Sequence, residues 1–109
     1  MLIYKILLPA EWARFEADGR FDGSALDLRD GYIHCSSRDQ LAGTALRYFG
    51  AEPDLVVVAI DVLTMGEWVR WETSAHGGLF PHVYAPLPRA AVAAVHRIAG
   101  AASVDEVVP

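Results

Sequence analysis

The chain has 109 residues, 53% of them hydrophobic, and a formal net charge of −5 with neutral histidines. These values predict one folded domain and exclude a disordered chain, because apolar residues are numerous and spread along the sequence. No run approaches the roughly 20 apolar residues that a membrane-spanning helix needs. The acidic balance argues against a nucleic-acid-binding protein and favours a small-molecule ligand or a protein partner.

The N-terminal sequence MLIYKILLPAEW does not have the pattern of a signal peptide. Lys5 lies inside the apolar run rather than before it, and no small-residue cleavage pattern follows. The single cysteine, Cys35, cannot form an internal disulfide bond. Together these observations predict a cytoplasmic protein.

The first half of the chain predicts both strands and helices. Residues 2–7 read as a strand, and residues 9–19 as a helix with proline in its first turn and glycine at its end. Residues 20–31 contain two Asp-Gly pairs and predict a loop with turns. Residues 32–36 predict a short strand, and residues 37–50 a helix that opens with the capping pattern Ser-x-x-Gln.

The second half adds further strands and so predicts an α+β fold. Residues 54–62 form a continuous β-branched run that is typical of a strand buried on both faces. Residues 67–73 and 79–84 alternate as strands. The alanine-rich residues 89–98 fit either a helix or a strand, and residues 104–109 predict a final strand or a tail.

Side chains alternate between the two faces of a strand, and three of the predicted strands place aromatic and polar residues on one face. These sets are Tyr32, His34 and Ser36; Trp68, Arg70 and Glu72; and Phe80, His82 and Tyr84. If the faces converge, they form an aromatic-walled pocket suited to a flat, charged ligand such as a nucleotide. The alternative is that they are the solvent-facing sides of an antiparallel sheet.

The same alternation of faces assigns different roles to the residues of the reactive run His34-Cys35-Ser36-Ser37. Cys35 shares its face with Ile33, which predicts a buried thiol and turns it away from His34. Ser37 fits the N-cap of the following helix, and no GxSxG motif supports a catalytic serine. The helix start beside His34 offers free N–H groups, so Ser36 and Ser37 are candidates for binding an anion or phosphate.

The remaining histidines are predicted to lie outside the site. His76, in the glycine-rich segment SAHGGL, is predicted as a solvated loop residue, and His96 as a surface residue. A metal site made of His34, His82 and Glu72 would fit a three-ligand pattern, but no HExxH motif supports it, and no metal is predicted.

Several blocks of the sequence together resemble a small bacterial family known as domain of unknown function 952. The blocks are IYKIL, EW, GS..DL.DGYIHCS, a later Q…TA..YF, DLVVVAID, WE.S and FPHVYAPLP. The resemblance runs from about Ile3 to Val95, with the blocks in the same order and at the same spacing. Ala85 departs from the glycine expected after Tyr84.

The resemblance implies a fold similar to that of ADP-ribosyltransferases and tRNA 2′-phosphotransferases, with two small sheets and two main helices around a ligand cleft. By position, His34 would bind a ribose, Glu72 would be the late glutamate that stabilises or activates the sugar, and Tyr84 or Tyr48 would stack on the ligand. Cys35 stands where such transferases have a glycine. The resemblance also favours a short helical turn at 89–92 followed by a strand at 93–98.

The leading hypothesis is a transferase-like enzyme that binds NAD or a related nucleotide, with His34 and Glu72 as catalytic residues. The ligand-binding candidates, several of which could contact phosphate, are Ser36, Ser37, Arg70, His82 and Tyr84. Two alternatives remain open, a non-catalytic nucleotide-binding module and a protein-interaction domain with exposed aromatic residues.

Overall fold

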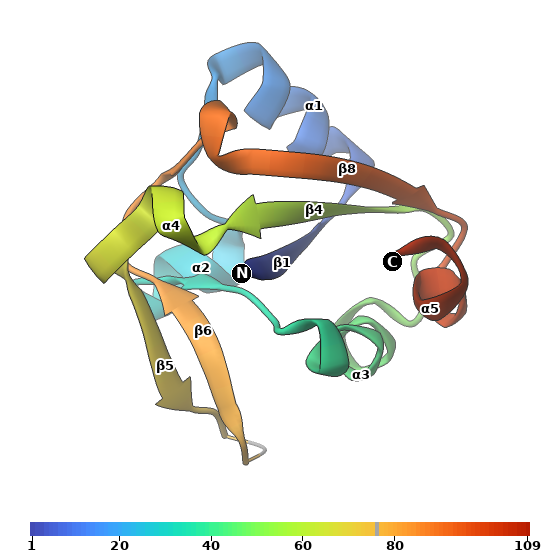
Figure 1. Cartoon of the computed structure of the whole chain (residues 1–109). Coiled ribbons are helices and arrows are strands. Elements are labelled where there is room, and N and C mark those ends of the chain that lie inside the picture. The colour runs from blue at the N-terminus through green and yellow to red at the C-terminus, as the bar shows by residue number, and fades with distance from the viewer. Residues whose placement is uncertain (76) are drawn as a thin grey trace.

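A three-stranded antiparallel sheet forms the centre of the computed structural model, which describes residues 1–75 and 77–109. Its strands are β1 (Leu2–Leu7), β4 (Leu55–Asp61) and β8 (Val92–Ile98), in the order β1-β4-β8 (Figure 1). β4 lies in the middle, and its first six residues are all buried. The prediction of a fully buried strand in this region is confirmed.

Helices and the remaining strands cover both faces of this sheet. On one face, Trp12 and Phe15 of α1 (Pro9–Asp18) pack in a cluster with alternate residues of β1 and β4. On the opposite face, Leu41 of α3 (Arg38–Phe49) and Val104 of α5 (Val104–Val107) pack on the intervening residues. The continuous apolar run of β4 therefore reflects burial on both sides.

A second three-stranded sheet carries most of the predicted site residues. Its strands are β3 (Ile33–His34), β6 (Leu79–Val83) and β5 (Val69–Thr73), in the order β3-β6-β5, all antiparallel. β2 (Arg20–Phe21) pairs with β7 (Leu87–Pro88) in a small third sheet. The α+β class is confirmed, with three sheets among the described residues in place of the two expected.

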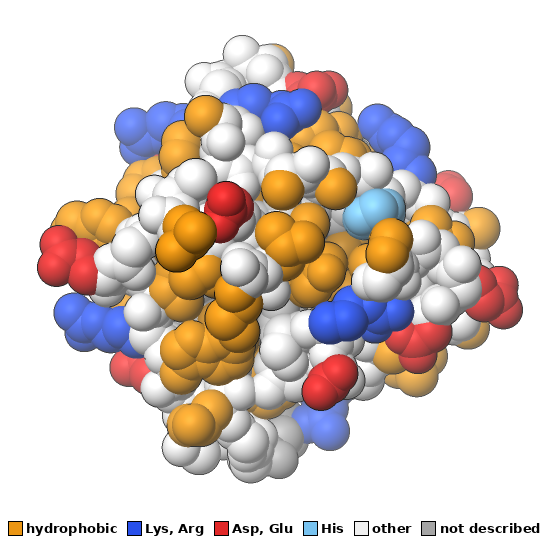
Figure 2. Space-filling model, in the orientation of Figure 1, with side chains coloured by type: hydrophobic (Ala, Val, Ile, Leu, Met, Phe, Trp, Pro, Cys, Tyr) orange, Lys and Arg blue, Asp and Glu red, His pale blue; other side chains and the backbone are white. Residues whose placement is uncertain are grey.

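The β5–β6 hairpin projects from the rest of the molecule (Figure 1). Hydrophobic side chains gather over this region in the space-filling view (Figure 2). Trp71 on β5 and Leu79 on β6 are 38% and 55% exposed. The hairpin therefore presents an apolar surface outside the core.

The prediction of a loop over residues 20–31 was wrong, because this segment contains β2 and a helix, α2 (Ala25–Asp30). Ser24 is the N-cap of α2, and its N–H donates to Oδ2 of Asp27 at 2.9 Å. Gly31 closes the helix with φ +87°, a left-handed conformation that favours glycine. The second Asp-Gly pair is thus a helix end rather than an isolated turn.

The C-terminal residues also differ from the prediction of a strand or tail. Val104–Val107 form the short helix α5, because Val104 and Val108 are buried in the cluster that contains Leu41 of α3. The ambiguous segment is resolved as a 3-10 turn at Arg89–Ala91 followed by β8, which confirms the order implied by the resemblance.

Two other strand boundaries are corrected. β5 begins at Val69, after the short helix α4 (Val62–Met65) and a 3-10 turn at Gly66–Trp68. The strand predicted for 32–36 is shorter, because Ser36 leaves β6 and forms an isolated bridge with Tyr4 of β1. The prediction for His76 lies outside the described residues. No helix in the described part of the chain is long and apolar enough to cross a bilayer.

Candidate functional site

His34, His82 and Arg70 form a cross-strand row on one face of the second sheet. In the strand register, His34 of β3 pairs with His82 of β6, which also pairs with Arg70 of β5. Directly paired residues of antiparallel strands place their side chains on the same face. The neighbouring residues Ile33 and Val83 point to the other face and join the core with β1 and β4.

Asp27 of α2 contacts the His34 end of this row and is deeply buried, with 2% of its surface exposed. Nζ of Lys5, on β1, lies 3.0 Å from Oδ2 and 3.2 Å from Oδ1 of Asp27, and it also donates to the backbone carbonyl of His34. The backbone N–H of His34 donates to Oδ1 at 3.0 Å, and that of Ser24 donates to Oδ2. Asp27 therefore joins β1, α2 and β3.

These contacts decide the ionisation state of Asp27. Burial raises the pKa of this carboxyl group, but the hydrogen bonds from His34 and Ser24 and the positive charge of Lys5 outweigh that effect. The net pKa lies well below the ordinary value for an aspartate. Asp27 is thus an ionised carboxylate on α2, and its neighbours Lys5 and His34 lie on β1 and β3.

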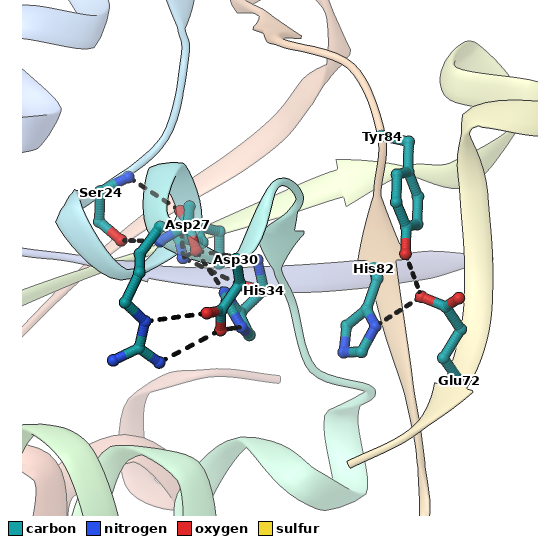
Figure 3. A network of polar contacts seen from close by, with 9 residues as sticks. Ser24, Asp27, Asp30, His34, Glu72, His82 and Tyr84 are labelled. Carbon is teal, nitrogen blue, oxygen red and sulfur yellow. Dashed lines mark hydrogen bonds and ion pairs between the residues drawn. The ribbon is translucent and has the colours of Figure 1, made fainter. Parts of the chain in front are cut away.

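The imidazole of His34 lies between two carboxylates of α2 (Figure 3). Its Nδ1 is 2.6 Å from Oδ1 of Asp27, and its Nε2 is 3.0 Å from Oδ2 of Asp30. The hydrogen bond from Arg29 lowers the pKa of Asp30. Because ionised carboxylates only accept hydrogen bonds, each contact is a hydrogen bond when the ring nitrogen concerned carries the proton.

Glu72 of β5 is held by a second pair of donors (Figure 3). The Tyr84 hydroxyl donates to Oε1 of Glu72 at 2.6 Å, and Nδ1 of His82 lies 2.8 Å from the same oxygen. These two hydrogen bonds lower the pKa of Glu72, while the bond to Glu72 raises the pKa of Tyr84. The result is an oriented carboxylate whose side chain is 38% exposed.

Tyr32 lies between the hydrogen-bonded group around His34 and the group formed by Glu72, His82 and Tyr84. Its ring stacks on His82 with centroids 4.1 Å apart and planes at 21°, and it lies 4.6 Å from His34 and 5.4 Å from Tyr84. Burial and the nearby charges of Asp30 and Glu72 raise the pKa of Tyr32, which keeps its hydroxyl protonated. The contacting rings therefore form an aromatic cluster between carboxylates.

A cavity of about 220 Å³ opens beside this cluster. Tyr32 and Tyr84 line it, together with Asp22, Asp27, Leu28, Gly31, Ile33, Val83, Ala85 and Pro86. It is smaller than the usual ligand pocket of about 300–1,000 Å³ and would hold one ring or one sugar. A larger cavity of about 440 Å³ lies at the ends of β4 and β8, and residues of the cluster do not line it.

The structure brings together the predicted site residues His34, Glu72, Arg70, His82 and Tyr84. The guanidinium carbon of Arg70 lies 4.7 Å from the centre of the Tyr84 ring. The polar residues predicted on β3, β5 and β6 lie on one face of a single antiparallel sheet, on which His82 is buried and Arg70 is exposed.

Ser36 and Ser37 have structural contacts of their own. Ser36 is 3% exposed, and its hydroxyl donates to that of Thr44 on α3. Ser37 is the N-cap of α3, as predicted, and its backbone N–H donates to the side-chain oxygen of Gln40 at 2.9 Å. Tyr48 lies on α3 and is 55% exposed, while Tyr84 lies in the aromatic cluster.

Cys35 is 3% exposed and packs in the core with Ile33 and Val83, which confirms the prediction of a buried thiol. Burial raises the pKa of this thiol to about 12. A cysteine that remains protonated is a poor nucleophile. Of the run His34-Cys35-Ser36-Ser37, His34 is therefore the residue that remains a candidate for chemistry at the site.

Sequence reasoning missed Lys5, Asp27 and Asp30. The signals were present, because a lysine inside an apolar strand requires a buried partner, and Ser24-x-x-Asp27 fits the start of a helix. A helix over 25–30 places Asp27 and Asp30 on neighbouring positions of one helix face. Among the described residues, no group of three or more histidine, cysteine, aspartate or glutamate side chains is arranged to hold a metal ion.

The sequence pattern that underlies this arrangement matches a known family. The family model described as "Protein of unknown function (DUF952)" matches residues 6–95. The chain belongs to this family. No curated protein matches the chain.

Solved structures of a similar protein share this fold. The crystal structure of protein CC0527 from Caulobacter crescentus is 45% identical, with a TM-score of 0.83, and the match covers 87% of this chain and 83% of that one. A crystal structure of a double mutant of CC0527 is 46% identical with a TM-score of 0.82, over 87% and 83% of the two chains. The solution structure of CC0527 is 46% identical with a TM-score of 0.77, over 86% and 81%.

Proposed function

We propose that the cluster of Tyr32, His34, Glu72, His82 and Tyr84 binds a nucleotide-like ligand, with NAD or an ADP-ribose derivative as the first candidate. The observation that carries this proposal is the ionised Glu72, oriented by His82 and Tyr84 beside stacked aromatic rings. Flat rings bind on aromatic side chains, and a fixed carboxylate beside them can contact a sugar or a cationic ring. The cavity of about 220 Å³ that Tyr32 and Tyr84 line has room for one such group, while His34, Glu72 and His82 lie outside its lining.

The same cluster supports transferase chemistry on the ligand. When the bond between the ribose carbon and the leaving base breaks, the base takes the electron pair and positive charge develops on the sugar. The carboxylate of Glu72 would stabilise that charge, because it is ionised and held in place before the reaction. An incoming hydroxyl or water then forms the new bond to carbon and releases its proton to Glu72 or to solvent.

The proposal includes a fold of the ADP-ribosyltransferase type and a cytoplasmic location. Two three-stranded antiparallel sheets with helices α1 and α3 are compatible with that fold. The cluster lies on the face of the β3-β6-β5 sheet opposite Ile33 and Val83, which are buried against the central sheet. The ligand would therefore bind outside the shared core, at the side of α2.

Calorimetry with NAD, ADP-ribose and a 2′-phosphorylated nucleotide tests the binding. We expect at least one of them to bind the wild-type chain and to bind the Tyr84→Phe variant more weakly. His96→Ala, on β8 of the central sheet, is the control histidine variant and should bind normally. Failure of all three ligands to bind at millimolar concentration would overturn the proposal.

The Glu72→Gln variant separates an enzyme from a non-catalytic binding module. Glutamine keeps the shape of the side chain but carries no charge. An enzyme retains binding in this variant and loses most of its release of nicotinamide or transfer to an acceptor, as measured by chromatography. A binding module binds both forms and releases no product from either, which would exclude the transferase part of the proposal.

A further inference from the structure

The exposed residue Asp30 covers the outer nitrogen of the His34 ring. Nδ1 of His34 faces the buried Asp27, while Nε2 lies 3.0 Å from Oδ2 of Asp30. The side chains of His34 and Asp30 are 29% and 27% exposed. The accessible donor of the imidazole is thus occupied by a carboxylate at the molecular surface.

The guanidinium of Arg29 binds the same carboxylate. Nε of Arg29 donates to Oδ1 of Asp30 at 2.9 Å, and one terminal nitrogen of Arg29 lies 3.5 Å from the Oδ2 atom that His34 contacts. The Arg29 side chain is 72% exposed. A ring nitrogen of His34 and a guanidinium therefore converge on one anionic group, which is a donor set that recognises carboxylates and phosphates.

We propose that Nε2 of His34 and the guanidinium of Arg29 form an oxyanion subsite, now filled by the carboxylate of Asp30, into which a phosphate of the ligand binds by displacing Asp30. The inference rests on the proposed function, because it assigns a position to the phosphate of the nucleotide. It places that phosphate beside α2 instead of at Ser37, whose N–H is already bonded to Gln40.

The contacts of Asp30 make it displaceable. Asp30 is the last residue of α2, where the partial negative charge of the helix end disfavours a carboxylate. Both of its partners are partly or largely exposed, and exposed ion pairs are weak. The diphosphate of an ADP-ribose derivative, taken as a whole, carries more negative charge and more acceptor oxygens than one carboxylate, so it competes well for the same two donors.

The surrounding charges favour an anion once Asp30 has rotated away. Lys5 is paired with Asp27 and Arg20 with Asp22, so the other charges of the neighbourhood are the cations Arg29 and Arg70 and the carboxylate of Glu72. Asp27 stays bonded to Nδ1, so it continues to hold the His34 ring with Nε2 directed outward. The buried part of the network thus stays intact while the exposed carboxylate exchanges for the ligand.

Removal of the competing carboxylate tests the proposal. An internal competitor lowers the apparent affinity by the fraction of time that the subsite is free. We expect Asp30→Ala to bind ADP-ribose and inorganic pyrophosphate about tenfold more tightly than the wild-type chain. The double variant Arg29→Gln/Asp30→Ala should lose that gain, because one of the two donors is missing.

Asp105→Ala is the matched control. Asp105 is also an exposed partner of an arginine, since Nη1 of Arg38 donates to it at 2.9 Å, but it lies on α5. Asp105→Ala removes the same charge as Asp30→Ala. An equal gain in affinity in Asp105→Ala would therefore show a general charge effect and overturn the proposal. Thermal unfolding of Asp30→Ala verifies that the chain is folded.

The outcomes separate this inference from the proposed function. If pyrophosphate binds more tightly to Asp30→Ala but NAD and ADP-ribose bind no variant, the oxyanion subsite stands and the nucleotide proposal fails. If NAD binds the wild-type chain and the folded Asp30→Ala variant binds it no more tightly, the nucleotide proposal stands and the subsite is overturned.

Discussion

Nζ of Lys5 lies 3.0 Å from Oδ2 of Asp27, and the two side chains are only 7% and 2% exposed. The pair joins β1 of the central sheet to α2, and Lys5 also donates to the backbone carbonyl of His34. Since Asp27 in turn contacts the His34 ring, this buried ion pair anchors one half of the candidate site to the core.

The Lys5→Met variant should be markedly less stable than the wild-type chain. Methionine fills a similar volume but leaves the buried Asp27 without its main cation, and loss of one partner of a buried pair costs about 3 kcal/mol or more. Urea unfolding at neutral pH measures the change. Arg20→Met is the control, because Arg20 pairs with Asp22 in an ion pair whose side chains are 61% and 58% exposed. Equal stability of the two variants would contradict the role given to Lys5.

The free energy of unfolding should decrease at acid pH because of Asp27. Burial raises the pKa of Asp27, but His34, Ser24 and Lys5 outweigh it and hold the pKa well below 3.8. The unfolded chain therefore takes up a proton first as the pH falls, so this stabilisation is complete above about pH 4 and decreases toward lower pH.

The Asp27→Asn variant isolates that effect. It should be less stable than the wild-type chain at neutral pH, because Lys5 loses its buried partner. Its free energy of unfolding should fall less steeply between neutral and acid pH, because one carboxylate with a lowered pKa is gone. Urea unfolding at a series of pH values gives both slopes, and identical slopes would show that Asp27 is not the residue responsible.

Part of the site could be predicted from the sequence, because the alternation of side chains along a strand is a local rule. Once β5 and β6 pair in antiparallel register, the positions of Arg70, Glu72, His82 and Tyr84 on one face follow from a period of two. The cluster could be predicted to that extent from residue types alone. The stacking of Tyr32 on His82 depends in addition on the contact of β3 with β6, which no local pattern specifies.

The other half of the site depends on tertiary contacts. α2 is six residues long and flanked by Asp-Gly pairs, so its sequence reads as turns, and its capping residues are what make it helical. The contact between Lys5 and Asp27 spans 22 positions of the sequence. In the same way, the short α5 is stabilised by burial of Val104 and Val108 against α3, which sequence patterns near the C-terminus do not show.

Glu72 and Tyr84 should change each other's titration. The hydrogen bond from Tyr84 lowers the pKa of Glu72 and raises that of Tyr84 above 10.0. In Tyr84→Phe the pKa of Glu72 should rise toward its ordinary value, as followed by carboxyl carbon NMR. In Glu72→Gln the pKa of Tyr84 should fall toward 10.0, as followed by ultraviolet absorbance.

The two titrations have an internal reference. His82 also hydrogen-bonds Glu72, so the pKa of Glu72 in Tyr84→Phe should remain below its value in a Tyr84→Phe/His82→Ala double variant. Tyr48, which lies on α3 and is 55% exposed, serves as the comparison tyrosine in the absorbance experiment. Unchanged titration of both partners in the single variants would show that the 2.6 Å contact does not persist in solution.

Cys35 should resist thiol reagents as long as the chain is folded. Its side chain is 3% exposed, and burial raises its pKa to about 12, so little thiolate forms at mildly alkaline pH. We expect no reaction with a disulfide reagent in the native state and one equivalent in denaturant. Because labelling then requires opening of the core, the less stable Lys5→Met variant should react faster than the wild-type chain. Rapid labelling of the wild-type chain would contradict the burial of Cys35 and return it to the list of candidate nucleophiles.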